Sequence, residues 1–254
     1  MRCRGPSSRL GHWLAAVLAL LSWAPGARAQ GLVADLSSHL IAITTGFVGT
    51  DVVLFGTTDR PGDIVVVVRG PEQEAVVRRR GRVAGLWMNV ESVAFTQVPS
   101  FYVVAATQPV ERILPEAERA RHEIGLDQMR ARPVDPSVPP GKIARFRAAL
   151  IQEKQGMGLY GTGTGQVAVL GERLFRTNVY FPSNVSTGLY SVGVYQIRNG
   201  QVVNAQTTPL VVSKVGFSAE ISEFAKRQSL YYGILAVLGA VAAGWGAAAM
   251  FRRS

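Results

Sequence analysis

Short apolar stretches separated by turn residues follow one another from residue 32 to residue 108. Stretches such as TDVVLFGTT and FYVVAAT are rich in β-branched and aromatic residues, which favour strands. The run from Ile64 to Val68 is apolar at every position, as is typical of a strand buried on both faces. Many short strands at close spacing predict a β-sandwich for this part of the chain.

The pattern changes to a helical period in the middle of the chain. The segment Pro115–Ala131 begins with a proline, which is favoured at the first helical position, and carries a weak apolar stripe. Four prolines within residues 132–141 end this helix. The segment Lys142–Gln155 places Phe146 and Leu150 on one face. We expect the two helices to form an insertion that packs against the sheet or covers it as a lid.

A second β-rich region covers residues 166–215. Asn199-Gly200, between VYQIR and QVVNA, is the strongest two-residue hairpin signal in the chain. The sequence leaves open whether the two β-rich regions form one sandwich or two. We expect an immunoglobulin-like β-sandwich in architecture only, because the Cys–Trp–Cys signature of true immunoglobulin domains is absent.

The N-terminal residues have the pattern of a secretory signal peptide. Three arginines within residues 2–9 precede an apolar run from Trp13 to Trp23, and Ala27 and Ala29 are the small residues that signal peptidase recognises. The apolar run is short for a membrane span of about 20 residues, so an uncleaved anchor is the less favoured alternative. Cleavage after Ala29 predicts that the following residues are exported.

An uncharged segment near the C-terminus, Leu230–Phe251, predicts a single transmembrane helix. Its 22 residues would extend about 33 Å as a helix, which is enough to cross a hydrocarbon core of about 30 Å. The signal peptide orients this helix with the preceding domain in the periplasm and the C-terminus in the cytoplasm. We therefore expect a single-pass protein of the inner membrane.

Small residues recur along one face of the predicted transmembrane helix. Ala236, Ala240, Gly244 and Ala248 follow one another at steps of four residues. Small side chains let a second helix approach closely, so this stripe is a candidate helix–helix contact with an integral membrane partner or with a second copy of the chain. The alternative is a segment that is simply rich in alanine and glycine.

The patterns together predict a mainly β chain with a two-helix insertion and one C-terminal span. The expected segments are a signal peptide (1–29), a β-sandwich (30–110), a helical insertion (111–158), a β-rich segment that completes a sandwich (159–217), a juxtamembrane segment (218–229), the transmembrane helix (230–251) and a cytoplasmic tail (252–254).

The formal net charge of +10 suggests a polyanionic partner. Much of this charge belongs to the two ends, however, and the exported part keeps 21 basic residues against 17 acidic residues, a net charge of +4. Export removes nucleic acid from the expected partners, and no repeated alternation of basic and aromatic residues indicates a strand-binding groove.

The sequence holds few groups for catalysis or metal binding. The single cysteine, Cys3, lies in the predicted signal peptide. His39 and His122 are the only histidines after the predicted cleavage site. GMGLYG, residues 156–161, matches the glycine pattern of a dinucleotide site, but a predicted helix precedes it where a strand is needed. We expect no cofactor, no metal site and no enzymatic activity.

The stretch RRRGRVAGLWMN, from Arg78 to Asn89, combines four arginines with a tryptophan. Its alternation predicts two strands, 74–80 and 82–89, that turn at Gly81. Val77, Val83, Leu86 and Met88 would then be available to the core, and Trp87 would point to the opposite face. The candidate contacts for an anion or a partner are Arg78, Arg79, Arg80, Arg82 and Trp87.

Three blocks carry a resemblance to a known family: IAITTGFVGTDVVLFGTT, DIVVVVRGPE and RRRGRVAGLWMNVESVAFTQVPSFYVVAAT. Together with the C-terminal span, they resemble the alphaproteobacterial transmembrane protein family, whose members have a signal peptide, a β-rich domain and one C-terminal helix. The resemblance covers essentially the whole mature chain and transfers no catalytic residue. It also implies a genomic association with a permease of the sulfite-exporter type.

These observations predict a non-enzymatic accessory protein for a membrane partner, which the resemblance suggests is such a permease. The alternative is a periplasmic domain that binds an anion or another solute, because the exported part is basic and its arginines cluster.

Overall fold

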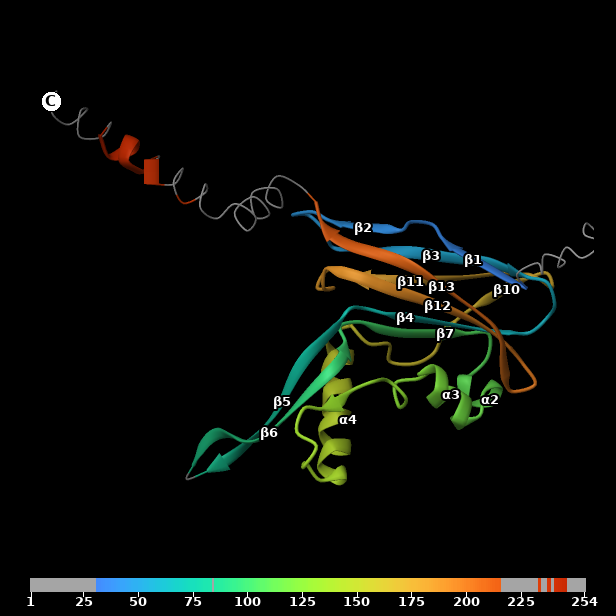
Figure 1. Cartoon of the computed structure of the whole chain (residues 1–254), viewed down its shortest axis with the longest axis horizontal. Helices are drawn as coiled ribbons and strands as arrows, with labels where there is room; N and C mark the ends of the chain where they lie inside the picture. The colour runs from blue at the N-terminus through green and yellow to red at the C-terminus, as the bar shows by residue number, and fades with distance from the viewer. Residues whose placement is uncertain (1–30, 84, 216–232, 234–236, 239, 246–254) are drawn as a thin grey trace, which may run out of the picture. The chain divides into compact units, whose positions relative to one another are not determined.

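The computed structural model describes residues 31–83, 85–215, 233, 237–238 and 240–245 (Figure 1). The chain divides into two units, Met1–Gly31 and Leu32–Ser254, and the elements given below belong to the second unit. The predicted signal peptide lies outside the described residues. The described part of the chain is mainly β, as the sequence predicts.

The predicted transmembrane helix is described only in part. Residues 233, 237–238 and 240–245 are α-helical, and they include Ala240 and Gly244 of the small-residue stripe. Ala236 and Ala248 lie outside the described residues. Among the described residues, none of the helices is long and apolar enough to cross a membrane.

The first sheet is antiparallel and has four strands. Its order is β1 (Leu32–Leu36), β3 (Gly49–Thr58), β11 (Leu174–Pro182) and β10 (Ala168–Leu170). Buried and exposed side chains alternate along β11, as expected of a strand with one face on the core and the other in solvent.

The second sheet has six strands and contains both β-rich regions of the sequence. Its order is β2 (Leu40–Ile43), β13 (Gln201–Lys214), β12 (Gly188–Arg198), β4 (Asp63–Arg69), β7 (Tyr102–Ala106) and β9 (Gly165–Gln166). The β13–β2 and β7–β9 pairs are parallel and the others are antiparallel. The hairpin predicted at Asn199-Gly200 joins β12 to β13, and both residues have the positive φ that this turn requires.

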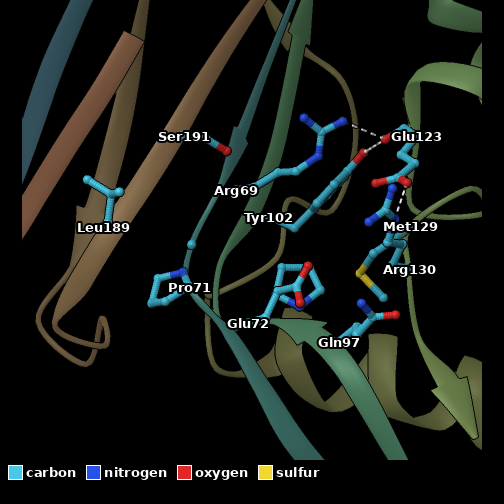
Figure 2. A pocket seen from close by; sticks show the side chains of 12 residues that line it. Arg69, Pro71, Glu72, Gln97, Tyr102, Glu123, Met129, Arg130, Leu189 and Ser191 are labelled. Atoms are coloured by element: carbon cyan, nitrogen blue, oxygen red, sulfur yellow. Dashed lines mark hydrogen bonds and ion pairs between the residues drawn. The ribbon is translucent and has the colours of Figure 1, made fainter. Parts of the chain in front are cut away.

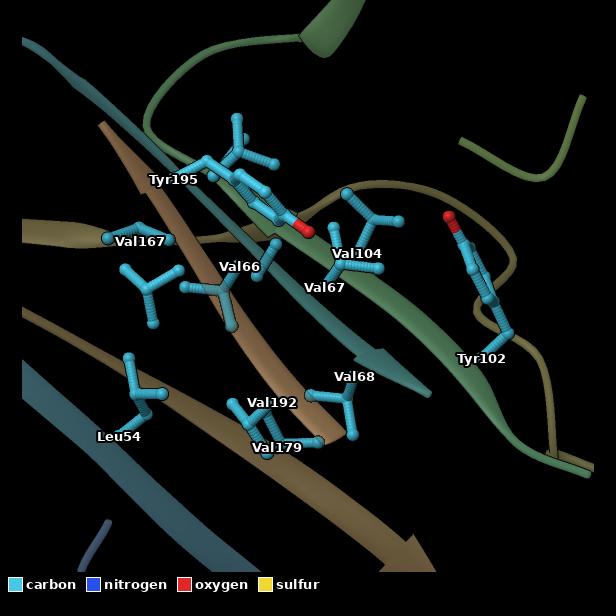
Figure 3. Close-up of a cluster of buried hydrophobic side chains, with 14 of the residues drawn as sticks. Leu54, Val66, Val67, Val68, Tyr102, Val104, Val167, Val179, Val192 and Tyr195 are labelled. Carbon is cyan, nitrogen blue, oxygen red and sulfur yellow. The ribbon is translucent and has the colours of Figure 1, made fainter. Parts of the chain in front are cut away.

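One hydrophobic core joins the two sheets. Figure 3 shows Leu54 and Val179 of the first sheet in one cluster with Val68 and Val192 of the second sheet. The sheets therefore form a single sandwich-like arrangement. The immunoglobulin-like architecture is not confirmed, because two of the strand pairs are parallel whereas immunoglobulin sheets are antiparallel.

The central strand β4 is buried on both faces, as its apolar run predicts. Val66 and Val68 face the first sheet, and Val65 and Val67 face the opposite way by alternation. Ile124 and other apolar residues of the helical insertion belong to the same core cluster and cover the second face.

The helical insertion differs from the prediction in its first half. It contains α2 (Val110–Ile113), α3 (Glu116–His122) and α4 (Pro140–Gly156). The helix predicted over Pro115–Ala131 is wrong beyond His122, because Glu123 adopts the left-handed conformation and Gly125 follows with φ +108°. The apolar residues Ile124 and Met129 are buried from a loop.

The third sheet consists of β5 (Glu72–Val83), β6 (Leu86–Pro99) and the short β8 (Arg132–Pro133). The inner half of the β5–β6 hairpin packs on α4 through a second hydrophobic cluster that includes Phe95, Phe146 and Leu150. The burial of Phe146 and Leu150 confirms the predicted apolar face of α4. This cluster holds the hairpin in place while its outer half extends beyond α4 (Figure 1).

Candidate functional site

The outer half of the β5–β6 hairpin, residues 78–83 and 85–90, is here named the arm. Both of its faces are open to solvent: each of these residues is exposed except Gly81, which is half-buried. The neighbouring residues Val77 and Val93, by contrast, are buried against α4. The arm is therefore a two-stranded ribbon that has no covering layer among the described elements.

The strand register gives the arm two chemically different faces. Arg82 lies opposite Trp87 and Arg80 opposite Asn89 on one face. Val83 lies opposite Leu86, and Gly81 opposite Met88, on the other face, because directly paired residues share a side of the ribbon. One face is thus cationic with an indole, and the other carries the paired Arg79 and Glu91 at its base and is apolar from Gly81 to the tip.

The apolar side chains of the arm are unusually exposed for their size. Leu86 is 69% exposed, Trp87 is 71% exposed and Met88 is 51% exposed. Val90 fills the space above Gly81, where an added Cβ would lie 2.9 Å from a methyl group of Val90. Exposed apolar side chains gathered on one face, as Val83, Leu86 and Met88 are, favour an interaction site.

Two sequence predictions about this stretch are corrected by the structure. The turn does not lie at Gly81: β5 continues to Val83, and the chain reverses before Leu86 at Gly85, whose φ is +85°. Val77 is buried as predicted, but Val83, Leu86 and Met88 are not part of the core. Alternation places them on the α4 side of the ribbon correctly, yet α4 does not extend far enough to cover them.

The four candidate arginines differ in their partners. Arg79 lies 3.3 Å from the Glu91 carboxylate, which also accepts a hydrogen bond from Arg145 of α4 at 3.1 Å. Arg82 donates to the Gly85 carbonyl at 3.4 Å. Arg78 and Arg80 form no ion pair with any described residue. The charge of the arm is therefore only partly compensated.

His39 and His122 lie in different parts of the fold and pair with different carboxylates. His39 lies 2.9 Å from Asp35 beside β1, and His122 lies 3.7 Å from Glu118 on α3. Within the described part of the chain, no group of three possible ligands could hold a metal ion. The GMGLYG segment follows α4 and contributes Leu159 and Tyr160 to the core.

The sequence gives no signal for a cavity at the base of the β5–β6 hairpin. This cavity is lined by Arg69 at the end of β4, Tyr102 at the start of β7 and Gln97 of β6, among others. The lining also includes Glu123, whose carbonyl accepts a hydrogen bond from Arg69. The cavity therefore depends on contacts between segments more than 50 residues apart. Only a folded chain can bring these residues together.

The described part of the chain is a mainly β domain with an exposed amphipathic ribbon, and the comparison with protein families assigns the chain to a class of transmembrane proteins. The chain belongs to the family described as "Putative transmembrane protein (Alph_Pro_TM)", whose model matches residues 31–253. The resemblance drawn from the sequence blocks is thereby confirmed. No curated protein and no solved structure matches the chain.

Proposed function

We propose that the protein is a membrane-anchored, non-enzymatic accessory protein that contacts an integral membrane partner through the arm. The single observation that carries the proposal is the apolar face formed by Val83, Leu86 and Met88 on a ribbon that none of the described helices and strands covers.

An apolar face that is open to water costs free energy. A two-stranded hairpin is only marginally stable in water without a layer against its apolar face. The arm nevertheless exposes large apolar side chains at its end, although exposed strand edges favour unwanted association. A surface of this kind is retained where a partner covers it, and tryptophan and arginine are the residues that contribute most to such contacts.

The chemistry of the arm indicates what the partner offers. The apolar face fits an apolar groove, and Arg80 and Arg82 beside Trp87 fit a rim with negative charge. A permease of the type that the family resemblance suggests is our proposed partner. The small-residue stripe at Ala236, Ala240, Gly244 and Ala248 would supply a second contact within the membrane, or with another copy of the chain.

The proposed topology is single-pass in the inner membrane, with the β-rich domain in the periplasm and the C-terminus in the cytoplasm. Its supports are the signal-peptide pattern of residues 1–29, the uncharged segment 230–251 and membership in a transmembrane protein family.

Replacing both Leu86 and Met88 with serine tests the proposed contact. We expect the amount of membrane partner that co-purifies after crosslinking in cells to fall by about tenfold or more, because the loss of two buried apolar contacts weakens binding by roughly 1.5–3 kcal/mol or more. The thermal unfolding midpoint should change little, since both side chains are exposed in the isolated protein.

The matched control is the replacement of Leu170 and Leu174 with serine. These residues are cross-strand partners in the β10–β11 hairpin and are also about half exposed, at 47% and 46%. We expect this variant to retain the partner. Equal retention by both variants, or equal loss from both, would contradict a specific role for the arm.

A further inference from the structure

A cavity of about 240 Å³ lies where the β5–β6 hairpin joins the sandwich, at the end of the hairpin opposite the arm (Figure 2). The sandwich contributes Arg69 and Tyr102, and the two strands of the hairpin contribute Glu72 and Gln97. The loop after α3 contributes Glu123 and other residues. The cavity therefore contacts three parts of the fold at once.

Arg69 provides a positive charge that no carboxylate of the described residues compensates. Its Nη2 donates to the carbonyls of His122 at 2.7 Å and Glu123 at 3.0 Å, and its guanidinium carbon lies 5.9 Å from the centre of the Tyr102 ring. Its Nε is buried without an acceptor. Carbonyl oxygens hold this guanidinium in place, but they do not neutralise it.

The other charged residues of the cavity limit the net charge of the ligand. The Glu123 carboxylate pairs with Arg130, so these two charges compensate each other. The Glu72 carboxylate forms no ion pair with a described residue, and it disfavours a ligand with two or more negative charges. Tyr102 adds no charge, because burial raises its pKa to about 12.

Apolar groups complete the lining. The side chains of Pro71, Pro99, Met129 and Leu189 surround the polar residues. Small-molecule sites commonly combine such an apolar lining with a few polar groups that fix the orientation of the ligand.

The backbone is in an uncommon conformation on both sides of this cavity. Gln97 has φ +58° and Glu123 has φ +55°, and only one other non-glycine residue, Asn199, has positive φ in the described part of the chain. Left-handed non-glycine residues are concentrated at functional sites. Gln97 lies in a β-bulge of β6: the register shifts between the Gln73–Val98 and Ala75–Phe95 pairs, so that Thr96 and Gln97 lie opposite Glu74 alone, and a bulge bends the strand that contains it.

We infer that this cavity binds a small monoanion with an apolar group, of the class of short-chain carboxylates, with the carboxylate on Arg69. The inference goes beyond the proposed function and does not depend on it. Because the ligand would contact both the sandwich and the base of the hairpin, its binding would also stabilise the direction in which the hairpin leaves the sandwich.

Calorimetric titration of the full chain in mild detergent tests the site, with sodium butyrate as the probe and sodium sulfate as the comparison. We expect saturable butyrate binding at millimolar concentrations and none of comparable strength for sulfate. Absence of saturable butyrate binding would overturn the inference, and equal binding of sulfate would overturn the ligand class.

Two variants locate the site. Arg69→Lys keeps the charge but loses the planar fork, and we expect it to weaken butyrate binding by about tenfold. Arg198→Lys is the matched control: the Arg198 Nε is also buried without an acceptor among the described residues, but Arg198 does not line this cavity. We expect wild-type affinity from this control. Equal weakening in both variants would contradict binding at Arg69.

A third variant separates binding from structural effects on Arg69. Ser191→Trp places a large side chain into the cavity without removing the guanidinium, because Ser191 lines the cavity from β12, where it is the cross-strand partner of Arg69. We expect this variant to fold and to lose butyrate binding. Hydrogen exchange should also show that butyrate slows the exchange of amides near Glu72 and Gln97 in the wild type only. Undiminished butyrate binding by a folded Ser191→Trp variant would place the ligand elsewhere.

Discussion

Replacing Phe181 with alanine is expected to lower the free energy of unfolding by about 3–5 kcal/mol. Phe181 lies on β11, is 1% exposed and stacks on Phe101 with 4.9 Å between ring centres. Tyr190 of the second sheet meets the same ring edge-on at 5.8 Å. Truncation would remove both aromatic contacts and leave a cavity between the sheets, where the close-packed neighbours cannot collapse fully.

The neighbouring residue Tyr180 supplies the control for this prediction. It is 55% exposed on the same strand, and its hydroxyl donates to the Val48 carbonyl at 3.3 Å. Tyr180→Ala should cost less than about 1 kcal/mol. Urea unfolding of the full chain in mild detergent compares the two variants. Similar losses in both would mean that the two sheets do not enclose one core.

Stability is expected to fall by about 2–3 kcal/mol through the ionisation of Tyr102 alone as the pH rises from 10 to 12. Burial is the main cause that raises the Tyr102 pKa from 10.0 to about 12, and Arg69 opposes this shift. Below pH 10 the hydroxyl is protonated in both states, so its contribution is fully present. Above pH 10 the unfolded chain ionises first, and the contribution is lost by about pH 12.

The pKa values of Tyr160 and Tyr190 are also raised by burial, so the three tyrosines act in the same direction. Urea unfolding across this pH range measures the loss. In Tyr102→Phe the loss of stability between pH 10 and pH 12 should be smaller by the contribution of the Tyr102 ionisation. The variant should also be less stable at neutral pH, because the Gly125 N–H and the Glu123 carbonyl lose their hydrogen bonds to the Tyr102 hydroxyl. An unchanged pH dependence in this variant would contradict the burial of a protonated Tyr102.

The regular elements could be predicted from the sequence because their signals are local. The apolar run of β4, the apolar face of α4 and the turn at Asn199-Gly200 each depend on a few adjacent residues. The end of α3 was harder to predict, because the apolar stripe continues past Glu123 while the backbone does not. Ile124 is buried in the core, but from the loop that follows α3 and not from a continued helix.

The candidate sites depend on long-range geometry and were predicted less well. Alternation along β5 and β6 assigns side chains to two faces, but it cannot tell whether another layer covers a face. The stretch from Arg78 to Asn89 was therefore recognised as unusual, whereas the exposure of Leu86 and Met88 was not. Arg69 carries no local signal at all, because the carbonyls that accept its hydrogen bonds, those of His122 and Glu123, lie at the C-terminal end of α3, more than 50 residues away.

The most direct test of the central proposal is site-specific photo-crosslinking from the tip of the arm in cells. A photoreactive amino acid replaces Trp87, which is 71% exposed, and in a second strain it replaces the exposed Tyr180 of the sandwich. We expect an adduct between position 87 and an integral membrane protein that is absent from position 180. Adducts with lipid alone, or the same adducts from both positions, would contradict the proposal that the arm binds a membrane protein.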